Sequence, residues 1–200
     1  MVWTNDQDFE KDWWGDCANT LGEENKQLTY AKLMGLRFFH NGKSPHNLNL
    51  EGKKVLDIGS GPISMLLKCI DCKGCIAADP CDYPSWVQDR YKLHGVTYLK
   101  SKGEDLNKLK TVFDEVWIYN VLQHVDDVKK IVDNALKCSK IIRIFEWIDT
   151  GTTPGHPNNL TQVWLDGLLK GEGKVSILNE PTLRGKCYYG VFKGEYYEKI

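Results

Sequence analysis

Two glycines and two aspartates in this chain have the spacing of a nucleoside site, in which a glycine turn and a carboxylate further along the chain contact the ligand. Gly59 and Gly61 follow the apolar run that contains Asp57. Glycine accepts a positive φ and has no Cβ, so a ligand can approach the backbone of such a turn closely. A second apolar run ends in Asp79, about 20 residues further on, where a carboxylate can accept both hydroxyls of a ribose. The alternative interpretation is a solvated helix N-cap, a place that aspartate favours.

The elements that must position these residues alternate along the chain from residue 53. The predicted strands are 54–59, 75–80, 96–101, 114–121 and 140–148, and the predicted helices are 62–70, 83–95 and 125–139, with a shorter turn or helix at 104–110. A helix at 160–170 and two neighbouring strands at 174–180 and 185–197 follow. This order predicts an α/β fold, namely a Rossmann-like, seven-stranded, mostly parallel sheet with helices on both faces and an antiparallel last strand.

The first 50 residues differ from the rest of the chain. An acidic and aromatic start is followed by a helical pattern over 21–39 and by a loop over 40–52 that is rich in Asn, Gly and Pro. We therefore predict an N-terminal helical cap or lid at 1–50 and one Rossmann-like domain at 51–200.

Composition excludes several classes of protein. The formal net charge is -1 and the sequence pI is about 6.5, so a basic face for nucleic acid is not expected. No run approaches the roughly 20 apolar residues that span a bilayer. The first residues lack the basic and apolar regions of a signal peptide. We expect a soluble, cytoplasmic protein whose partner is a small molecule, not nucleic acid or a membrane, and whose oligomeric state the sequence leaves open.

The seven cysteines are expected to be reduced, because their number is odd and no export signal precedes them. Cys69, Cys72 and Cys75 have the C-x2-C-x2-C spacing of some metal sites. Cys69 belongs to the apolar pattern of a predicted helix, whereas Cys75 begins a predicted strand. Their side chains should therefore point in different directions, and we expect no metal there.

Two ligands compete for the glycine turn. A dinucleotide requires G-x-G-x-x-G, but here Ser64 stands in place of the third glycine, and Pro62 removes one N–H that a pyrophosphate would use. S-adenosylmethionine carries no phosphate, so it needs close backbone approach and a ribose acid but no anion site.

Four blocks decide between these ligands. They are VLDIGSGP at 55–62, AADP at 77–80, GEDL at 103–106 and DEVWIYNVLQHVDD at 114–127. In this order and spacing they resemble the class I S-adenosylmethionine-dependent methyltransferases, over residues 53–150 and, with the two late strands, to about 193. The sequence departs from the family at Ile63, where many members have a third glycine.

The resemblance implies roles for residues at the ends of the strands. Asp57 and the backbone of Gly59, Ser60 and Gly61 would hold the methionine end of the cofactor. Asp79 and Pro80 would lie at the ribose. Glu104 or Asp105 would lie near the adenine, with a pair of helix-capping acids as the alternative interpretation. Asn120 and Val121 would form the floor of the cofactor site, and Tyr30, with Gln27 on the same helix, would reach the cofactor's carboxylate.

The run after the fourth predicted strand narrows the acceptor. Residues 119–122 read YNVL and lack the Pro-Pro-aromatic turn of exocyclic-amine DNA methyltransferases. Methyltransferases that attack cytosine C5 carry a Pro-Cys pair after the fourth strand, whereas Pro80-Cys81 lies at the second predicted strand. Metal-assisted catechol methyltransferases need an Asp at the fourth strand and an Asp-Asn pair after the fifth. Those places hold Asn120 and the WID run at 147–149 here, so no catalytic metal is expected. VLQHVDD instead resembles the V-L-x-H-V block of methyltransferases acting on small molecules, including quinone and sugar-derived acceptors.

A general base is needed only where the acceptor must lose a proton. His124 is the first candidate because its intrinsic pKa suits the task. The alternative interpretation is a histidine that caps a helix or orients the cofactor floor. His156, on the loop after the fifth strand, and Glu146, at the end of that strand, are further candidate catalytic residues. A simply exposed histidine, and a salt bridge of Glu146 with Arg143, are the alternatives.

Trp13 and Trp14 are candidate substrate-binding residues, because indole rings stack on planar or sugar acceptors, although such rings also serve as packing anchors. The sequence thus predicts an S-adenosylmethionine-dependent enzyme that methylates O or N of a small molecule, such as a sugar or aromatic metabolite. An NAD(P)-dependent oxidoreductase and a non-catalytic cofactor-binding module are the alternatives.

Overall fold

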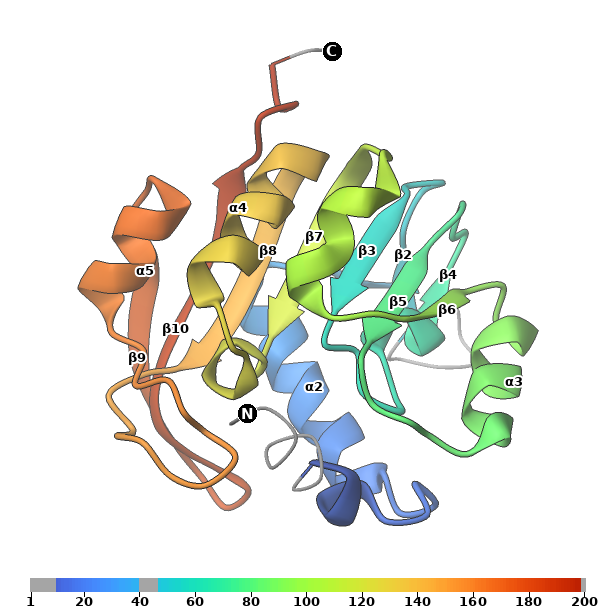
Figure 1. The fold of residues 1–200 in the computed structure, drawn as a ribbon, viewed down its shortest axis with the longest axis horizontal. Coiled ribbons are helices and arrows are strands. Elements are labelled where there is room, and N and C mark those ends of the chain that lie inside the picture. The colour runs from blue at the N-terminus through green and yellow to red at the C-terminus, as the bar shows by residue number, and fades with distance from the viewer. Residues whose placement is uncertain (1–9, 40–46, 199–200) are drawn as a thin grey trace.

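The computed structural model describes residues 10–39 and 47–198, and a seven-stranded sheet forms its centre (Figure 1). The strand order is β6-β5-β3-β7-β8-β10-β9. The bounds are Val55–Ile58 for β3, Ile76–Asp79 for β5, Thr97–Lys100 for β6, Phe113–Tyr119 for β7, Ser139–Trp147 for β8, Lys174–Glu180 for β9 and Leu183–Lys193 for β10. Neighbours from β6 to β8 are parallel, and β10 is antiparallel to both β8 and β9. The predicted Rossmann-like sheet with an antiparallel last strand is confirmed.

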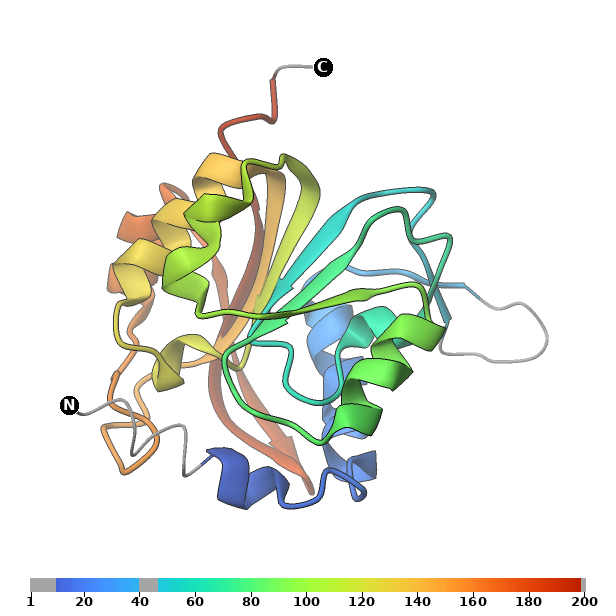
Figure 2. The same ribbon diagram turned by 45° about the vertical axis from the view of Figure 1, so that its right-hand side comes forward.

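Helices cover both faces of this sheet (Figure 2). On one face, α4 and α5 pack together with the short 3-10 helix η2, and on the other lie α2, α3 and the 3-10 helix η1. Their bounds are Leu21–Leu33 for α2, Met65–Lys68 for η1, Ser85–Leu93 for α3, Gly103–Leu109 for η2, Val128–Cys138 for α4 and Gln162–Leu169 for α5. The chain therefore has one apolar core on each side of the sheet.

Local sequence explains the central elements. β3 reads VLDI, and all of its residues are buried because it lies between β5 and β7 and is covered on both faces. Asp127 begins α4 by accepting the backbone N–H of Lys130 at 2.9 Å. Ile131, Val132 and Ala135 then form the buried side of this helix.

The predicted helix at 62–70 is wrong. Only Met65–Lys68 is helical, as η1, and Cys69–Ile70 forms strand β4. The Ser64 hydroxyl accepts the backbone N–H of Leu66 at 2.9 Å, and β4 pairs in parallel with β2 (Asn47–Asn49). Strand pairing engages the backbone groups that a longer helix would need, so no α-helix follows the glycine turn.

The N-terminal helix is shorter than predicted, and part of the predicted loop at 40–52 is strand β2. α2 ends at Leu33, and Gly35 adopts a φ of +74°, a left-handed conformation that takes the chain out of the helix. Phe38–Phe39 forms β1, which pairs antiparallel with β2, and β1-β2-β4 make a second small sheet. Residues 40–46 lie outside the described part of the chain.

α2 packs directly on the large sheet. The Tyr30 ring stacks on Phe145 of β8, with ring centroids 4.1 Å apart, and Arg143 Nη1 donates to the Met34 carbonyl at 2.8 Å. The predicted cap at 1–50 includes residues 1–9 and 40–46, which lie outside the described residues. Its boundary with a domain at 51–200, and its role as a lid, stay predictions.

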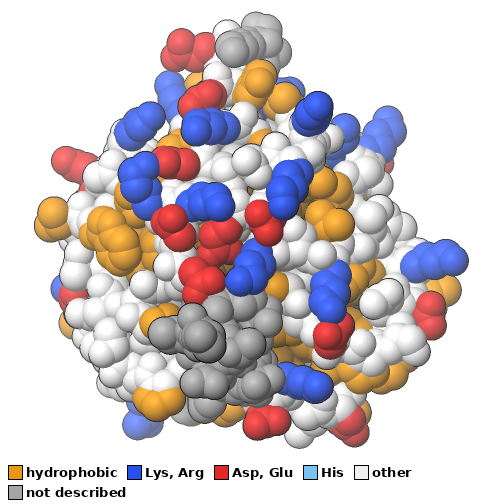
Figure 3. All heavy atoms as spheres, viewed as in Figure 1, with side chains coloured by type: hydrophobic (Ala, Val, Ile, Leu, Met, Phe, Trp, Pro, Cys, Tyr) orange, Lys and Arg blue, Asp and Glu red, His pale blue; other side chains and the backbone are white. Residues whose placement is uncertain are grey.

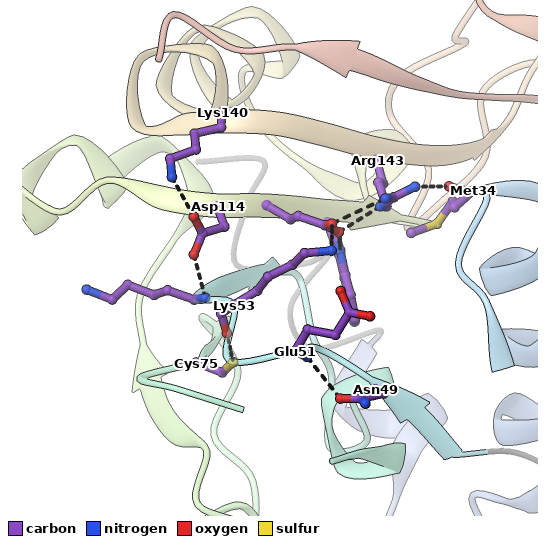
Figure 4. A network of polar contacts seen from close by, with 11 residues as sticks. Met34, Asn49, Glu51, Lys53, Cys75, Asp114, Lys140 and Arg143 are labelled. Atoms are coloured by element: carbon purple, nitrogen blue, oxygen red, sulfur yellow. Dashed lines mark hydrogen bonds and ion pairs between the residues drawn. The ribbon is translucent and has the colours of Figure 1, made fainter. Parts of the chain in front are cut away.

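Charged side chains form a network toward the amino ends of the strands (Figure 4). Glu115 of β7 is 2% exposed, and its carboxylate lies 2.7 Å from Arg143 Nε and 3.2 Å from Lys53 Nζ. Asp114 accepts from Lys140 Nζ and from the backbone N–H of Lys54, both at 2.8 Å. These contacts tie β7, β8 and the approach to β3 together.

The outer face over α4 and η2 carries both signs of charge. In Figure 3, Lys and Arg side chains lie among Asp and Glu, so no exclusively basic patch covers the described residues of this face. Among the described residues, no helix combines the length and apolar character that crossing a membrane requires.

The cysteines are not all reduced, contrary to the expectation. Cys72 and Cys75 form a disulfide across a tight turn that brings their Cα atoms to 6.0 Å, whereas Cys17, Cys69, Cys81, Cys138 and Cys187 are free. Positive φ angles at Asp71 and Gly74 make this turn. Within the described part of the chain, no group of three or more His, Cys, Asp or Glu is placed to hold a metal ion.

Candidate functional site

A cavity of about 460 Å³ opens at the carboxyl ends of β3, β5 and β7. Most predicted site residues line it: Trp13, Trp14, Tyr30, Gly59, Ser60, Gly61, Asp79, Pro80, Asn120, Val121, His124 and His156, together with Gln27. Residues 10–14 form a helical turn that lies at this same end of the sheet (Figure 2). The fold therefore brings together side chains from the N-terminus, from three strand ends and from the loop after β8.

The glycine turn is shaped first by the protein's own packing. Gly59 has a φ of +70°, and a Cβ there would lie 2.6 Å from Val121 Cγ1. Gly61 has a φ of +61°, and its Cβ would lie 3.4 Å from Trp14 Cζ2. Sequence reasoning assigned the close approach to a ligand, but at Gly59 it is Val121 that requires the missing Cβ.

Asp79, the last residue of β5, lines the cavity and is hydrogen-bonded to the glycine turn. Its oxygens accept the backbone N–H groups of Gly61 and Cys81, both at 2.9 Å, and the Tyr83 hydroxyl at 3.1 Å. Burial raises the pKa of Asp79 despite these hydrogen bonds. All three donors are uncharged, so the carboxylate has no cation beside it.

Asp57 lies beneath the turn and does not line the cavity. Its Oδ2 accepts the hydroxyls of Ser64 and of Tyr119, the latter at 2.6 Å. Its Oδ1 has no hydrogen-bond partner among the described residues. Burial raises the pKa of Asp57 to about 7. Its partners among the described residues are neutral hydroxyls, so this carboxyl also has no counter-charge beside it.

Glu146 is buried behind the cavity wall and does not line it. Its Oε1 accepts the backbone N–H groups of Val121 and Leu122, both at 3.0 Å, and burial raises its pKa to about 8. Arg143 pairs with Glu115, so the salt bridge considered for Glu146 is absent from the described contacts. Glu146 therefore positions the backbone that carries the cavity floor.

Glu104 and Asp105 also lie outside this cavity. Glu104 is buried and accepts the backbone N–H of Asp127 at 3.2 Å, while Asp105 pairs with Lys108 at 3.1 Å. Asp105 lines a second hollow of about 560 Å³, and Pro80 lines both spaces. Of the two predicted adenine acids, Asp105 thus lines the neighbouring space across Pro80, whereas Glu104 lines neither space.

His124 ends the 3-10 helix η3 (Leu122–His124), and both of its ring nitrogens have partners. The Gly155 carbonyl can only accept, so Nδ1 carries the hydrogen in their 2.8 Å contact. Nε2 then accepts from the Gln123 amide at 3.1 Å, and that amide also donates to Asn120 Oδ1 at 2.9 Å. Burial and the nearby His156, whose ring centroid is 4.5 Å away, lower the pKa of His124 to about 4.

Glu10 is the main cavity residue that sequence reasoning missed. Its Oε1 lies 3.1 Å from His124 Nδ1, and it lines the cavity beside Trp13 and Trp14. Burial raises its pKa to about 7, with Asp79 and Glu23 contributing and a hydrogen bond from Trp14 opposing. Its spacing of three and four residues from the tryptophans was the available signal, because such residues share one side of a helix.

The chemistry of the cavity suits a positively charged nucleoside better than a pyrophosphate. Asp57, Asp79 and Glu10 surround the glycine turn without a Lys or Arg partner among the described residues. No α-helix starts behind the turn, so the N-terminal dipole that binds phosphates is missing. S-adenosylmethionine, which carries an ammonium and a sulfonium and no phosphate, fits this set of carboxylates.

Comparison with known proteins agrees with this geometry. Residues 56–141 match the family model described as a methyltransferase domain. No curated protein matches the sequence.

Solved structures share the fold at low sequence identity. N-methyltransferase NodS from Bradyrhizobium japonicum, in complex with S-adenosylhomocysteine, has a TM-score of 0.62 and 14% identity, over 96% of this chain and 99% of that one. The 1,6-didemethyltoxoflavin-N1-methyltransferase of Burkholderia thailandensis, with 1,6-didemethyltoxoflavin and S-adenosylhomocysteine bound, has a TM-score of 0.61 and 15% identity, over 94% of this chain and 86% of that one.

An O-methyltransferase family protein from Burkholderia thailandensis has a TM-score of 0.51 and 14% identity, over 72% of this chain. This chain spans about half of that protein, 52% of its length. At these identities the likeness concerns the fold.

Proposed function

Since this chain is a class I S-adenosylmethionine-dependent methyltransferase, with its methyltransferase domain matched over residues 56–141, we propose that it methylates an oxygen or nitrogen atom of a small molecule. The observation that carries the proposal is the cavity, which extends beyond the glycine turn to the indole rings of Trp13 and Trp14. A space of about 460 Å³ matches the size of a small-molecule site.

S-adenosylmethionine is the cofactor, and when bound it supplies a methyl group on a sulfonium that is already activated for displacement. The protein then mainly contributes proximity and alignment. We assign Asp79 and Pro80 to the ribose, and the 59–61 turn with Asp57 beneath it to the methionine end. Glu104 and Asp105 are assigned to the adenine side.

The floor of the site is held in place by Glu146, which does not itself line the cavity. Glu146 fixes the backbone of Val121 and Leu122, which places Asn120 and the Gln123 amide beside each other. Glu146 is therefore proposed as a positioning residue. Tyr30 lines the same cavity. The side-chain N–H of Gln27 already donates to the Ile63 carbonyl at 2.7 Å.

On the acceptor side we assign Trp13 and Trp14 to substrate stacking and keep His124 and His156 as predicted catalytic residues. His124 is neutral, as a base must be, but its Nε2 would have to release the Gln123 amide before taking a proton. A merely positioning role of His124 is the alternative. No described residue set calls for a catalytic metal.

Ligand-induced stabilisation tests the function. A ligand at 100 times its dissociation constant stabilises the native state by about 2.7 kcal/mol, so S-adenosylmethionine and S-adenosylhomocysteine should both raise the Tm, and NADH should not. A panel of small amines, phenols and sugars is then screened for release of S-adenosylhomocysteine. Stabilisation by NADH alone would contradict the proposal and favour an oxidoreductase.

A further inference from the structure

We propose that Glu10 binds the amino group of a cationic amine acceptor and receives the proton which that group must lose. The inference rests on the proposed function and specifies its substrate class, because it selects nitrogen over oxygen as the methylated atom. It is carried by the place of Glu10 in the cavity and by the absence of a Lys or Arg partner for it among the described residues.

Glu10 reaches the cavity from the same helical turn as the two tryptophans. Its Oε1 lies 3.1 Å from His124 Nδ1, whose single hydrogen is donated to the Gly155 carbonyl at 2.8 Å. Trp14, on the same turn, acts to lower the pKa of this carboxyl. Glu10 therefore lies in the cavity wall beside two neutral side chains, those of His124 and Trp14.

Among the described residues that line the cavity, Asp79 is a second carboxylate without a cation beside it, and it is assigned to the ribose. Glu23 forms an ion pair with Lys26, and Arg184 lies on an exposed stretch of β10. His124 is neutral, since its pKa is lowered to about 4. An ammonium group of the acceptor would supply the counter-charge for Glu10, and the adjacent indole faces of Trp13 and Trp14 also attract cations.

The proton balance follows from this placement. An alkylammonium has no lone pair on nitrogen, so it must release one proton before the nitrogen can attack. That proton passes to the Glu10 carboxylate, which becomes a carboxylic acid, and the neutral amine keeps the lone pair. Burial, Asp79 and Glu23 raise the pKa of Glu10 to about 7, which makes its carboxylate a stronger proton acceptor than an ordinary glutamate.

The test measures binding to the complex with S-adenosylhomocysteine, without turnover. By calorimetry at about pH 8, we expect wild-type protein to bind 2-phenylethylamine at least about tenfold more tightly than 2-phenylethanol, the scale of one charge-assisted hydrogen bond. Glu10→Gln should remove this preference. Asp12→Asn, on the exposed side of the same turn, should keep it.

Each other outcome has a defined meaning. Equal affinity for the two probes, binding of neither, or an amine preference that survives Glu10→Gln would overturn the assignment. A loss of affinity for S-adenosylmethionine but not for S-adenosylhomocysteine in Glu10→Gln would also overturn it, because Glu10 would then face the sulfonium. If wild-type protein fails to bind S-adenosylhomocysteine at all, the proposed function fails, and not this inference alone.

Discussion

The carboxylates at the carboxyl ends of the strands differ from those near the amino ends in the groups that neutralise them. In and behind the cavity wall, Asp79, Asp57 and Glu146 accept from hydroxyls and backbone N–H groups, and burial raises the pKa of each. Near the amino ends, Glu115 and Asp114 pair with Arg143, Lys53 and Lys140 (Figure 4). Burial opposes ionisation there too, but these cations hold the pKa of both below the usual value.

The difference separates a structural region from a binding region. A buried carboxylate with its own guanidinium stays ionised and fixes the strands around it. A buried carboxylate with only neutral donors still lacks a counter-charge, which a cationic ligand can supply. The cofactor and the proposed amine are both positively charged, so the cavity end is the one that they would complete.

The largest expected effect comes from breaking the ion pair at the amino ends. Arg143→Ala leaves Glu115 buried without its main partner and also removes the donor to the Met34 carbonyl. We expect a loss of about 3–5 kcal/mol in the free energy of unfolding, measured with urea. Lys186→Ala is the control, because its exposed pair with Asp149 is worth no more than about 1 kcal/mol. Equal losses in the two variants would show that burial of Glu115 does not matter.

A packing change should come next at the cavity end, where order depends on a close backbone contact and not on ion pairs. Gly59→Ala combines a left-handed φ with a clash against Val121, which together cost about 2–4 kcal/mol. Val121→Ala in the same chain should restore part of that loss in urea unfolding. No coupling between the two substitutions would mean that Val121 does not set the need for glycine.

A smaller effect is expected on binding. Asp79→Ala should weaken S-adenosylhomocysteine at least about tenfold by calorimetry, roughly the loss of one pair of charge-assisted hydrogen bonds. Asp82→Ala is the matched control, since Asp82 is exposed and pairs with Lys100. An unchanged dissociation constant in Asp79→Ala would remove the ribose assignment.

The two regions are also expected to differ in how stability depends on pH. Glu146 has a pKa of about 8 in the folded chain and 4.5 as its ordinary value, so the folded state holds the extra proton between them. Its contribution to stability is complete below the lower value and is lost as pH rises through the upper one. Glu115 has the opposite sign, because its pKa is lowered and its contribution is lost as pH falls.

Glu146→Gln tests this pH dependence, because the amide does not titrate while its oxygen can still accept from Val121 and Leu122. Between about pH 5 and about pH 9, the variant should gain stability over wild type as pH rises, by at most about 1.4 kcal/mol per pH unit. Parallel urea stability curves for the two proteins would show that Glu146 does not hold the extra proton.

The residues around the turn were predictable because their order along the chain is itself the signal. Gly59, Asp79 and Asn120 each follow an apolar run, and parallel strands bring their carboxyl ends to one edge. Glu10 gave only a weak helical spacing to Trp13 and Trp14, since nothing local states which strand end a distant turn will cover. The helix predicted at 62–70 failed because pairing of β4 with β2, a contact remote in sequence, engages its backbone.

The sequence by itself determined the α/β sheet, its antiparallel last strand and the glycine turn with its two aspartates, because strand periodicity and turn chemistry are local properties. Only the tertiary structure decided which carboxylates lie at the cavity. It placed Glu146 behind the wall, put Glu10 beside His124, and paired Arg143 with Glu115 instead of Glu146. The physical reason is that burial and charge pairing depend on neighbours from distant parts of the chain, and these exist only once it has folded.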